Sequence, residues 1–403
     1  MVAALVALVW ANSPWHESYE DLWHSAVTLK VGAVGVEDDL RHLVNDGLMA
    51  LFFLVVGLEI KRELVAGDLR DPRAAALPAL GAAGGMVVPA ALYLALNVGQ
   101  DGVAGWGIPM ATDIAFAVGV LALLGPRVPT GLKLFLLTLA IVDDIGAIVV
   151  IAVFYTDAVD PVALAVAAAT VVAALACLRA RIWTPIVFVP LGIVCWLATY
   201  ESGVHATLAG VIFGLLAPAR PLTPGEVARE WAEDLSDEPT ADEMRSLTTV
   251  ASETVSVAER VQHDLHPLTS FVVVPIFALA NAGVRITGDA LSSPSAGRVA
   301  AGVALGLVAG KTLGVTAASA LAVRLRLSRL PDDVSWPQIV GVAAVAGVGF
   351  TVSLFVSGLA FDEPELGEAA KLAVLVASVI ASLLGAAVLV AAGRSRARDR
   401  ADA

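Results

Sequence analysis

Four ionisable side chains lie where an apolar sequence leaves no water to solvate them. Asp143, Asp144, Lys311 and Asp113 each fall close to the centre of an apolar run. Placing such a group in the hydrocarbon core of a bilayer costs roughly 2.5–3.5 kcal/mol even on the scale derived from helix insertion. Because all four share one depth and cannot snorkel to water, we predict that they meet in a central polar site or line a wet cavity.

The two adjacent aspartates indicate a site for a hard cation. Neighbouring carboxylates supply oxygen ligands that suit Na+ or Li+, and no cluster of thiols or imidazoles indicates a transition metal. Successive residues of an α-helix differ by about 100° in direction, so Asp143 and Asp144 should have different partners. We hypothesise that Asp144 faces the ion path and that Asp143 pairs with Lys311 when sodium is absent. Competition of Na+ and H+ for these carboxylates would then couple the two ions. The alternative is an Asp143–Lys311 pair that only fixes helix packing.

The composition is that of a membrane protein. The mean hydropathy is +0.81 and 16% of residues are charged, whereas about a quarter are charged in soluble domains. Runs of about 20 apolar residues predict an all-α polytopic protein with about twelve spans. These lie near 1–11, 43–60, 74–98, 106–124, 132–155, 161–178, 183–200, 203–218, 268–284, 299–323, 338–361 and 369–393. The run 1–11 is too short to span alone and lacks the charged start of a signal peptide, so we interpret it as a truncated first helix.

The positions of Lys and Arg predict the orientation, because cytoplasmic loops carry the excess of positive charge. Alternate connections hold nearly all of them, which places both termini in the cytoplasm. We therefore predict one transmembrane domain over 1–393, with an acidic cytoplasmic loop at 219–265, and a basic cytoplasmic tail at 394–403. The net charge of −13 comes largely from that loop, and no basic stripe indicates nucleic acid. Cys177 and Cys195 lie in apolar runs, where we expect buried thiols without a redox role.

One extracytoplasmic connection has the pattern of a small β-hairpin. It reads VTLKVGAVGVEDDL, in which Val27, Leu29 and Val31 alternate with smaller or polar residues before glycines that permit a turn. A hairpin alone in water is marginally stable, so it needs a partner, and a second copy of the same hairpin would supply one. An ordered loop is the alternative.

Two spans contain residues that interrupt an apolar helix near mid-membrane. Pro109 precedes Thr112 and Asp113 in one span, and the pair Gly347 and Gly349 permits unwound backbone in another. Half-helix N-termini carry partial positive charge, which Asp113 would balance. For the glycines alone, close packing between helices is the alternative reading.

Several motifs, in order along residues 43–390, resemble the NhaA family of Na+/H+ antiporters. They are GLMALFFLVVGLEIKREL, GWGIPMATDIAFAVGVLALLG, LAIVDDIGAIVVIAVFYT, SGVHATLAGVI, PIFALANAGV, GKTLGV and GVGFTVSLF. The resemblance implies twelve helices with inverted repeats, of which the fourth and eleventh are broken and cross at the ion site. Interrupted spans in both halves are typical of secondary transporters, this family among them.

The resemblance also implies an activity and a role for each central residue. It implies electrogenic exchange of Na+ or Li+ for H+ in the bacterial inner membrane, serving pH and sodium homeostasis, without a cofactor. Asp143 and Asp144 match the family's cation and proton carriers, Asp113 the residue that compensates the half-helix ends, and Lys311 the buried lysine of the tenth helix. Thr112 belongs to the same assembly, and a homodimer is expected.

Regulation by pH is implied for a further set of charged or titratable residues. These are Glu59, Glu63, His263 and His266 at the cytoplasmic funnel, and His205, whose imidazole would titrate in the useful range. An ordinary solvated helix end would also explain the two glutamates, and a hydrogen bond between helices would explain His205. Gln262 stands where the family has a funnel glutamate, which places its alkaline activation in doubt for this chain.

Two rival functions are compatible with parts of the pattern. A sodium-coupled symporter for an organic solute also uses broken helices, but it needs room and hydrogen-bond donors for the solute. An intramembrane aspartyl protease uses two aspartates on separate helices around one water, which the adjacent Asp143 and Asp144 do not supply.

Overall fold

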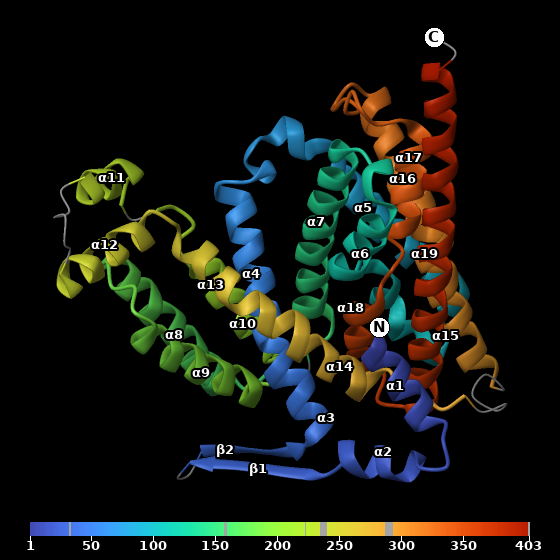
Figure 1. Cartoon of the computed structure of the whole chain (residues 1–403). Helices are drawn as coiled ribbons and strands as arrows, with labels where there is room; N and C mark the ends of the chain where they lie inside the picture. Colours follow the sequence, from blue (N-terminus) through green and yellow to red (C-terminus); the bar gives the residue numbers. More distant parts are fainter. Residues whose placement is uncertain (32–33, 157–158, 222, 234–239, 287–292, 402–403) are drawn as a thin grey trace. The chain divides into compact units, whose positions relative to one another are not determined.

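The structure is a computed structural model, and it describes residues 1–31, 34–156, 159–221, 223–233, 240–286 and 293–401. Most of the described chain is helical (Figure 1). It divides into two compact units, each described on its own below. Unit 1 comprises Met1–Asn45, Asp71–Asp157 and Val274–Ala403, and unit 2 comprises Asp46–Arg70 and Ala158–Val273. The assignment of 1–393 to a single transmembrane domain stays a prediction.

Among the described residues, seven helices are long and apolar enough to cross a membrane, or nine if each of two bent helix pairs forms one span. The chain is therefore a multi-pass membrane protein, as the composition predicted. The seven are Leu40–Val65, Pro72–Asn97, Thr130–Phe154, Pro161–Arg179, Val257–Asn281, Pro294–Arg324 and Pro364–Arg394. The shorter apolar helices are Val2–Ala11, Pro185–Glu201 and Thr207–Leu216. The count of twelve spans stays a prediction.

Unit 1 is built around α7 and the helices that pack on it. Its apolar core joins Leu132 and Leu139 of α7 to Val315 of α16 and Ile339 of α17, all almost fully buried. Its elements are α1 (Val2–Ala11), α2 (His16–Trp23), β1 (Ala26–Val31), β2 (Val34–Asp39), α3 (Leu40–Leu43), α5 (Pro72–Asn97), η3 (Asp101–Met110), α6 (Ile114–Leu124), η4 (Gly125–Arg127), α7 (Thr130–Phe154), α14 (Val274–Asn281), α15 (Pro294–Leu305), η6 (Gly306–Gly310), α16 (Lys311–Arg324), α17 (Trp336–Val345), α18 (Phe350–Ala360) and α19 (Pro364–Ala401).

The predicted hairpin is confirmed as a two-stranded antiparallel sheet. Strands β1 and β2 pair from Ala26 opposite Asp39 to Val31 opposite Val34, and the turn at 32–33 lies outside the described residues. Asp39 ends the second strand and caps α3, because its carboxylate accepts a 2.7 Å hydrogen bond from the amide of His42. The hairpin thus leads directly into the long apolar helix that follows.

Unit 2 contains most of the acidic segment, which was predicted as a solvated loop at 219–265. Its described residues are largely helical, with exposed charged side chains such as Asp242 and Arg245. Local capping explains this, since Thr240 and Glu243 form a capping box and Ser256 caps the next helix. Unit 2 comprises α4 (Met49–Val65), η2 (Asp68–Arg70), α8 (Pro161–Arg179), α9 (Pro185–Glu201), α10 (Thr207–Leu216), α11 (Gly225–Glu233), α12 (Ala241–Glu253), α13 (Val257–Leu268) and η5 (Thr269–Val273); η1 (Val44–Leu48) links its α4 to α3.

The helix predicted at 268–284 begins earlier than its apolar run. It starts at Val257, where the side chain of Ser256 caps the first turn by accepting from the amide of Glu259. His263 and His266 lie inside this helix. The apolar run begins at residue 268, where residues compatible with hydrocarbon begin. The helix begins earlier, because its backbone hydrogen bonds continue through the polar residues before the run.

Candidate functional site

The centre of the site is a buried ion pair between two helices of unit 1. Lys311 is the first residue of α16, Asp143 lies in the middle of α7, and both side chains are fully buried. The ammonium of Lys311 donates to Oδ2 of Asp143. The predicted pairing of these two residues is therefore present in the structure.

Thr112 lies beside this pair and contacts two acceptors at once. Its Oγ1 is 2.6 Å from Oδ2 of Asp143 and 2.8 Å from the carbonyl oxygen of Ala346. A hydroxyl carries one hydrogen, so Thr112 donates to one acceptor at a time unless Asp143 is protonated and donates back. The other carboxylate oxygen of Asp143, Oδ1, is buried and accepts no hydrogen bond from the residues that the structure describes. A buried carboxylate oxygen without a hydrogen-bond donor can bind a proton or a cation.

Asp113 holds together the N-termini of two helices. It is the N-cap of α6, where Oδ1 accepts a 3.1 Å bond from the amide of Phe116. Its Oδ2 accepts a 3.0 Å bond from the amide of Thr351 and a second bond from the Thr351 hydroxyl, at the start of α18. One carboxylate thus satisfies donors, and opposes the partial positive charge, at both helix ends.

The backbone departs from regular helix on either side of these contacts. The pair η3 and α6 bends by 45° at residues 111–113, and the pair α17 and α18 bends by 48° at the glycines before Phe350. The amide of Asp113 donates to the carbonyl of Val348 at 2.7 Å, so the two breaks bond directly to each other. The bends lie close to the residues where the sequence indicated interruptions, and the assignment of each bent pair to one broken span stays a prediction.

The position of Lys311 depends on a local irregularity and on a missing side chain. A π-helical turn, η6, directly precedes it, and such turns re-aim the residues that follow. On the facing helix α5, a Cβ at position 85 would lie 3.5 Å from Cδ of Lys311 and 2.7 Å from Val315. Gly85 therefore leaves room for the side chain of Val315, which follows Lys311 by one turn of α16, and it packs beside the lysine stem.

The sequence of the chain is similar to those of known Na+/H+ antiporters along nearly its whole length. The family model for Na+/H+ antiporter 1 matches residues 1–389. The chain is 48% identical to the Na(+)/H(+) antiporter NhaA 3 of Frankia alni over 391 residues, covering 96% of this chain and 84% of that protein. It is 47% identical to the NhaA antiporter of Rhodopirellula baltica, covering 96% and 90%, and 44% identical to NhaA 2 of Myxococcus xanthus, covering 100% and 89%.

The chain belongs to the NhaA family of Na+/H+ antiporters.

Asp144 is the remaining carboxylate of the predicted NhaA site. It follows Asp143 on α7 and is 6% exposed. The 100° step between neighbours directs it away from the bond that Asp143 makes to Lys311. The structure thus places Asp143, Lys311 and Thr112 in direct contact, and it keeps Asp144 and Asp113 adjacent to them along the chain.

The residues predicted for pH regulation in an NhaA protein lie in unit 2. Glu59 on α4 interacts electrostatically with Glu63, Arg62 and His266, and Arg62 also pairs with Glu63 at 3.3 Å. His266 shares a 3.0 Å hydrogen bond with Ser270. The other two predicted residues are His263, which is exposed on α13, and His205, which is half-buried in the turn before α10.

Several polar residues around the broken helices escaped the sequence analysis as functional candidates. Thr351 bonds Asp113 twice, Ser353 donates to the carbonyl of Ile108, and Tyr93 and Tyr155 donate to carbonyls of η3. A signal existed for Thr351, a hydroxyl directly after the glycines at mid-span. No comparable signal marked the tyrosines, which lie at the ends of ordinary apolar runs.

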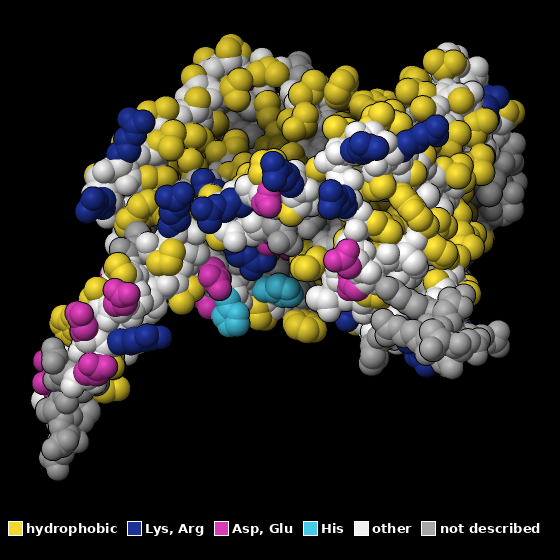
Figure 2. Space-filling model, turned by 90° about the horizontal axis from the view of Figure 1, so that it is seen from above, with side chains coloured by type: hydrophobic (Ala, Val, Ile, Leu, Met, Phe, Trp, Pro, Cys, Tyr) yellow, Lys and Arg dark blue, Asp and Glu magenta, His cyan; other side chains and the backbone are white. Residues whose placement is uncertain are grey.

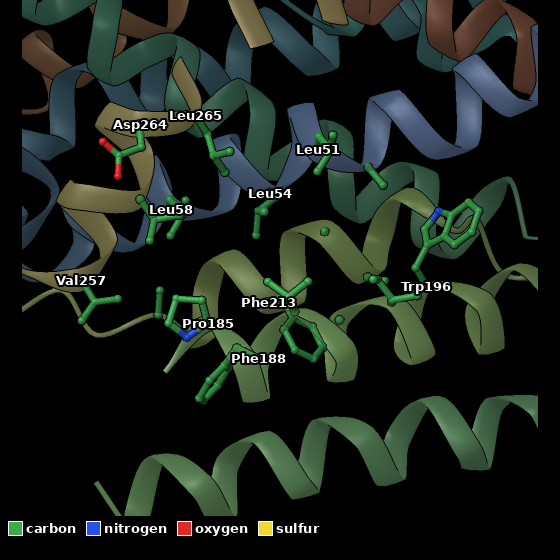
Figure 3. Close-up of a pocket in the computed structure, with 18 of the residues that line it drawn as sticks. Leu51, Leu54, Leu58, Pro185, Phe188, Trp196, Phe213, Val257, Asp264 and Leu265 are labelled. Atoms are coloured by element: carbon green, nitrogen blue, oxygen red, sulfur yellow. The ribbon is translucent and has the colours of Figure 1, made fainter. Parts of the chain in front are cut away.

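Unit 2 also contains a large apolar cavity of about 690 Å3 (Figure 3). Leu54 of α4, Phe188 of α9, Phe213 of α10 and Val257 of α13 point into it, and Asp264 lies at one end. Asp264 supplies the one carboxylate among the described lining residues. Such a lining offers hydrocarbon contact and, with a single carboxylate, fewer oxygen ligands than the roughly six to eight that a hard cation such as Ca2+ takes. The candidate ion site therefore remains the cluster in unit 1.

Proposed function

We propose that this chain expels Na+, and Li+, in exchange for H+, with Asp143 and Asp144 as the carriers of cation and proton. The observation that carries the proposal is the state of Asp143. Its Oδ2 is bonded to Lys311 and Thr112, while its Oδ1 is buried and accepts no bond from the described residues. A carboxylate held on one oxygen and open on the other can take a proton or a cation without rebuilding the site.

Charge balance explains why the two ions would compete. Two carboxylates and one ammonium leave a net negative charge in a fully desolvated region, and that charge is costly until a cation or a proton neutralises it. Asp113 is compensated separately by the two helix N-termini that it caps. Occupancy by Na+ therefore excludes protons and the reverse. Exchange follows when the site opens to each side in turn, with more protons entering than sodium ions leaving.

Thr112 would link this chemistry to the broken helices. When Asp143 is ionised, its Oδ2 competes with the carbonyl of Ala346 for the single hydrogen of Thr112. When a proton binds Oδ1, the Oδ2 oxygen carries less negative charge and accepts more weakly, so Thr112 donates to Ala346 instead. Proton binding thus strengthens the bond from Thr112 to the break between α17 and α18.

We propose further that each bent pair is one broken span, the fourth and the eleventh of twelve. Together with the three shorter apolar helices, the two pairs complete the twelve spans expected for the family. An even count places both termini on one side, which we assign to the cytoplasm of the bacterial inner membrane. The excess of Lys and Arg in alternate connections supports this orientation. Figure 2 shows Lys and Arg side chains on the surface together with Asp, Glu and His side chains.

Regulation by pH is proposed for Glu59, Glu63, His263, His266 and His205. The support is the local charge coupling of Glu59 with Glu63 and His266 on neighbouring helices of unit 2. Protonation of a histidine at this position would change the interaction with the glutamates. Vesicle transport measured against pH in His205→Arg tests the contribution of that residue.

The hairpin is proposed to join two copies of the chain. Strands β1 and β2 form a two-stranded sheet in the described chain, and the edge of such a sheet is a template for pairing with a second copy. Replacing residues 27–38 by a short glycine–serine linker is therefore expected to convert a dimer into a monomer. Native mass spectrometry of the full chain and of this variant checks the expectation. A dimer that persists without the hairpin contradicts it.

The first test of the function uses everted membrane vesicles that carry a pH gradient. Adding NaCl should collapse the gradient with the natural chain and leave it intact with Asp144→Asn, because an amide carries neither the charge nor the exchangeable proton. Asp264→Asn is the matched control, since this aspartate lies at the apolar cavity of unit 2. A gradient that NaCl leaves untouched with the natural chain across a wide pH range contradicts the proposal and favours the symporter.

A further inference from the structure

The half-helix before Thr112 has an unusual winding. Residues Asp101–Met110 form a 3-10 helix, η3, and Ala111 after it is extended. Runs of this winding longer than three or four residues are uncommon, because its hydrogen bonds are less well aligned than those of an α-helix. Ten residues of it need contacts from outside the segment to hold them.

Three hydroxyl groups supply such contacts. Tyr93 of α5 donates to the carbonyl of Gly102 at 2.6 Å, Tyr155 donates to that of Ala104 at 2.7 Å, and Ser353 of α18 donates to that of Ile108 at 2.8 Å. All three side chains are buried. The carbonyls of η3 are therefore bonded to three different elements of unit 1.

Tyr155 differs from the other two because it belongs to the chain segment that carries the ion site. It directly follows α7, the helix of Asp143 and Asp144. Its hydroxyl also accepts a 3.1 Å bond from the amide of Gly107. Next to Tyr155, Phe154 contacts Trp106 edge to face.

The two segments are thus joined at both ends, by Thr112 with Asp143 at one end and by Ala104 with Tyr155 at the other. Along α7, the twelve steps from Asp143 to Tyr155 span about 18 Å. From Ala104 to Thr112, six steps of 3-10 winding and two extended steps span about 18–19 Å, whereas α winding would give about 15–16 Å. The 3-10 winding thus matches the spacing of the two contacts on α7, whereas the α winding falls about 3 Å short of it.

We propose that Tyr155 is a positioning residue for the ion site, which keeps η3 in the 3-10 winding and thereby places the hydroxyl of Thr112 against Asp143. Without the Tyr155 hydroxyl, η3 loses the bonds to Ala104 and Gly107, its 3-10 winding opens more often, and Thr112 is no longer kept against the carboxylate. This inference rests on the proposed exchange at Asp143. Its structural half, the effect of Tyr155 on the winding of η3, can be measured without transport.

The structural half is tested by hydrogen–deuterium exchange on the purified full-length protein. Amides of residues 104–110 should exchange faster in Tyr155→Phe than in the natural chain. Tyr19→Phe is the matched control, because Tyr19 is fully buried in unit 1 and its hydroxyl bonds to the carbonyls of Leu279 and Ala280 rather than to η3. Unchanged protection of residues 104–110 in Tyr155→Phe overturns the proposal, whether or not the chain transports sodium.

The functional half is tested in proteoliposomes as the KM for Na+. Tyr155→Phe should raise this KM about three- to tenfold, the range that corresponds to one lost neutral hydrogen bond, with Tyr19→Phe unchanged. In a Thr112→Val background the same substitution should add nothing, because the hydroxyl that it positions is absent, while Thr112→Ser should retain the response. An equal rise in both backgrounds overturns action through Thr112, and an equal rise in Tyr19→Phe shows a general effect of losing a buried hydroxyl. If the natural chain shows no sodium-dependent proton transport, the proposed function fails. The hydrogen–deuterium measurement still decides whether Tyr155 holds the winding of η3.

Discussion

Lys311→Met is expected to abolish sodium-dependent exchange and to lower the free energy of unfolding by about 3–5 kcal/mol. The ammonium and the carboxylate of Asp143 are both fully buried, so removing the lysine charge leaves the aspartate charged and unpaired in a region without water. Breaking a buried pair from one side has a cost of this size. The thermal unfolding midpoint of the detergent-solubilised protein measures the loss, and it should shrink at lower pH because protonating Asp143 removes the unpaired charge.

Two further variants separate loss of the pair from loss of the lysine stem. Lys311→Met combined with Asp143→Asn leaves no unpaired charge at either of these positions, so its stability should return to within about 1 kcal/mol of the natural chain while exchange stays absent. Lys133→Met, on the exposed part of α7, should change stability by no more than about 0.5 kcal/mol. A single Lys311→Met variant as stable as the natural chain contradicts the interpretation of the ion pair.

The central charges could be predicted from the sequence because the bilayer leaves few alternatives. An aspartate and a lysine at one depth, with no water available, must find each other or a wet cavity, and Asp143 and Lys311 do form a pair. Pro109 likewise lies two residues before one bend, and Gly347 and Gly349 lie within the other. These inferences needed only residue type and depth.

The contacts of the hydroxyl groups could not be predicted in the same way. A 3-10 helix and an α-helix differ by one residue in hydrogen-bond spacing, and the sequence GWGIPM is compatible with either. Which carbonyl Tyr155 or Ser353 reaches depends on how α7 and α18 pack against η3, which is a property of the tertiary structure. Helix ends outside the apolar runs, such as Val257, were missed because capping by Ser256 lies beyond the apolar pattern.

Asp113→Asn is the second substitution with a large expected effect, and it acts through helix capping. The carboxylate accepts bonds from the amides of Phe116 and Thr351 and from the Thr351 hydroxyl. An asparagine keeps one acceptor and turns an NH2 group toward donors, so one of the two helix N-termini loses its cap. We expect a loss of about 2–4 kcal/mol, since each cap contributes about 0.5–2 kcal/mol and the uncapped donors are buried. The unfolding midpoint of the purified protein checks this.

The matched control for Asp113→Asn is Asp160→Asn at the start of α8. Asp160 is an exposed N-cap that serves one helix, through a 2.8 Å bond from the amide of Val162, and asparagine caps a helix about as well as aspartate. Its unfolding midpoint should therefore stay close to that of the natural chain. If Asp113→Asn also keeps the natural midpoint but loses exchange, then the carboxylate acts on the transported ion rather than on the helix ends. If its midpoint falls while the KM for Na+ is unchanged, then capping is its whole role, and the ion site needs only Asp143, Asp144 and the groups that hold them.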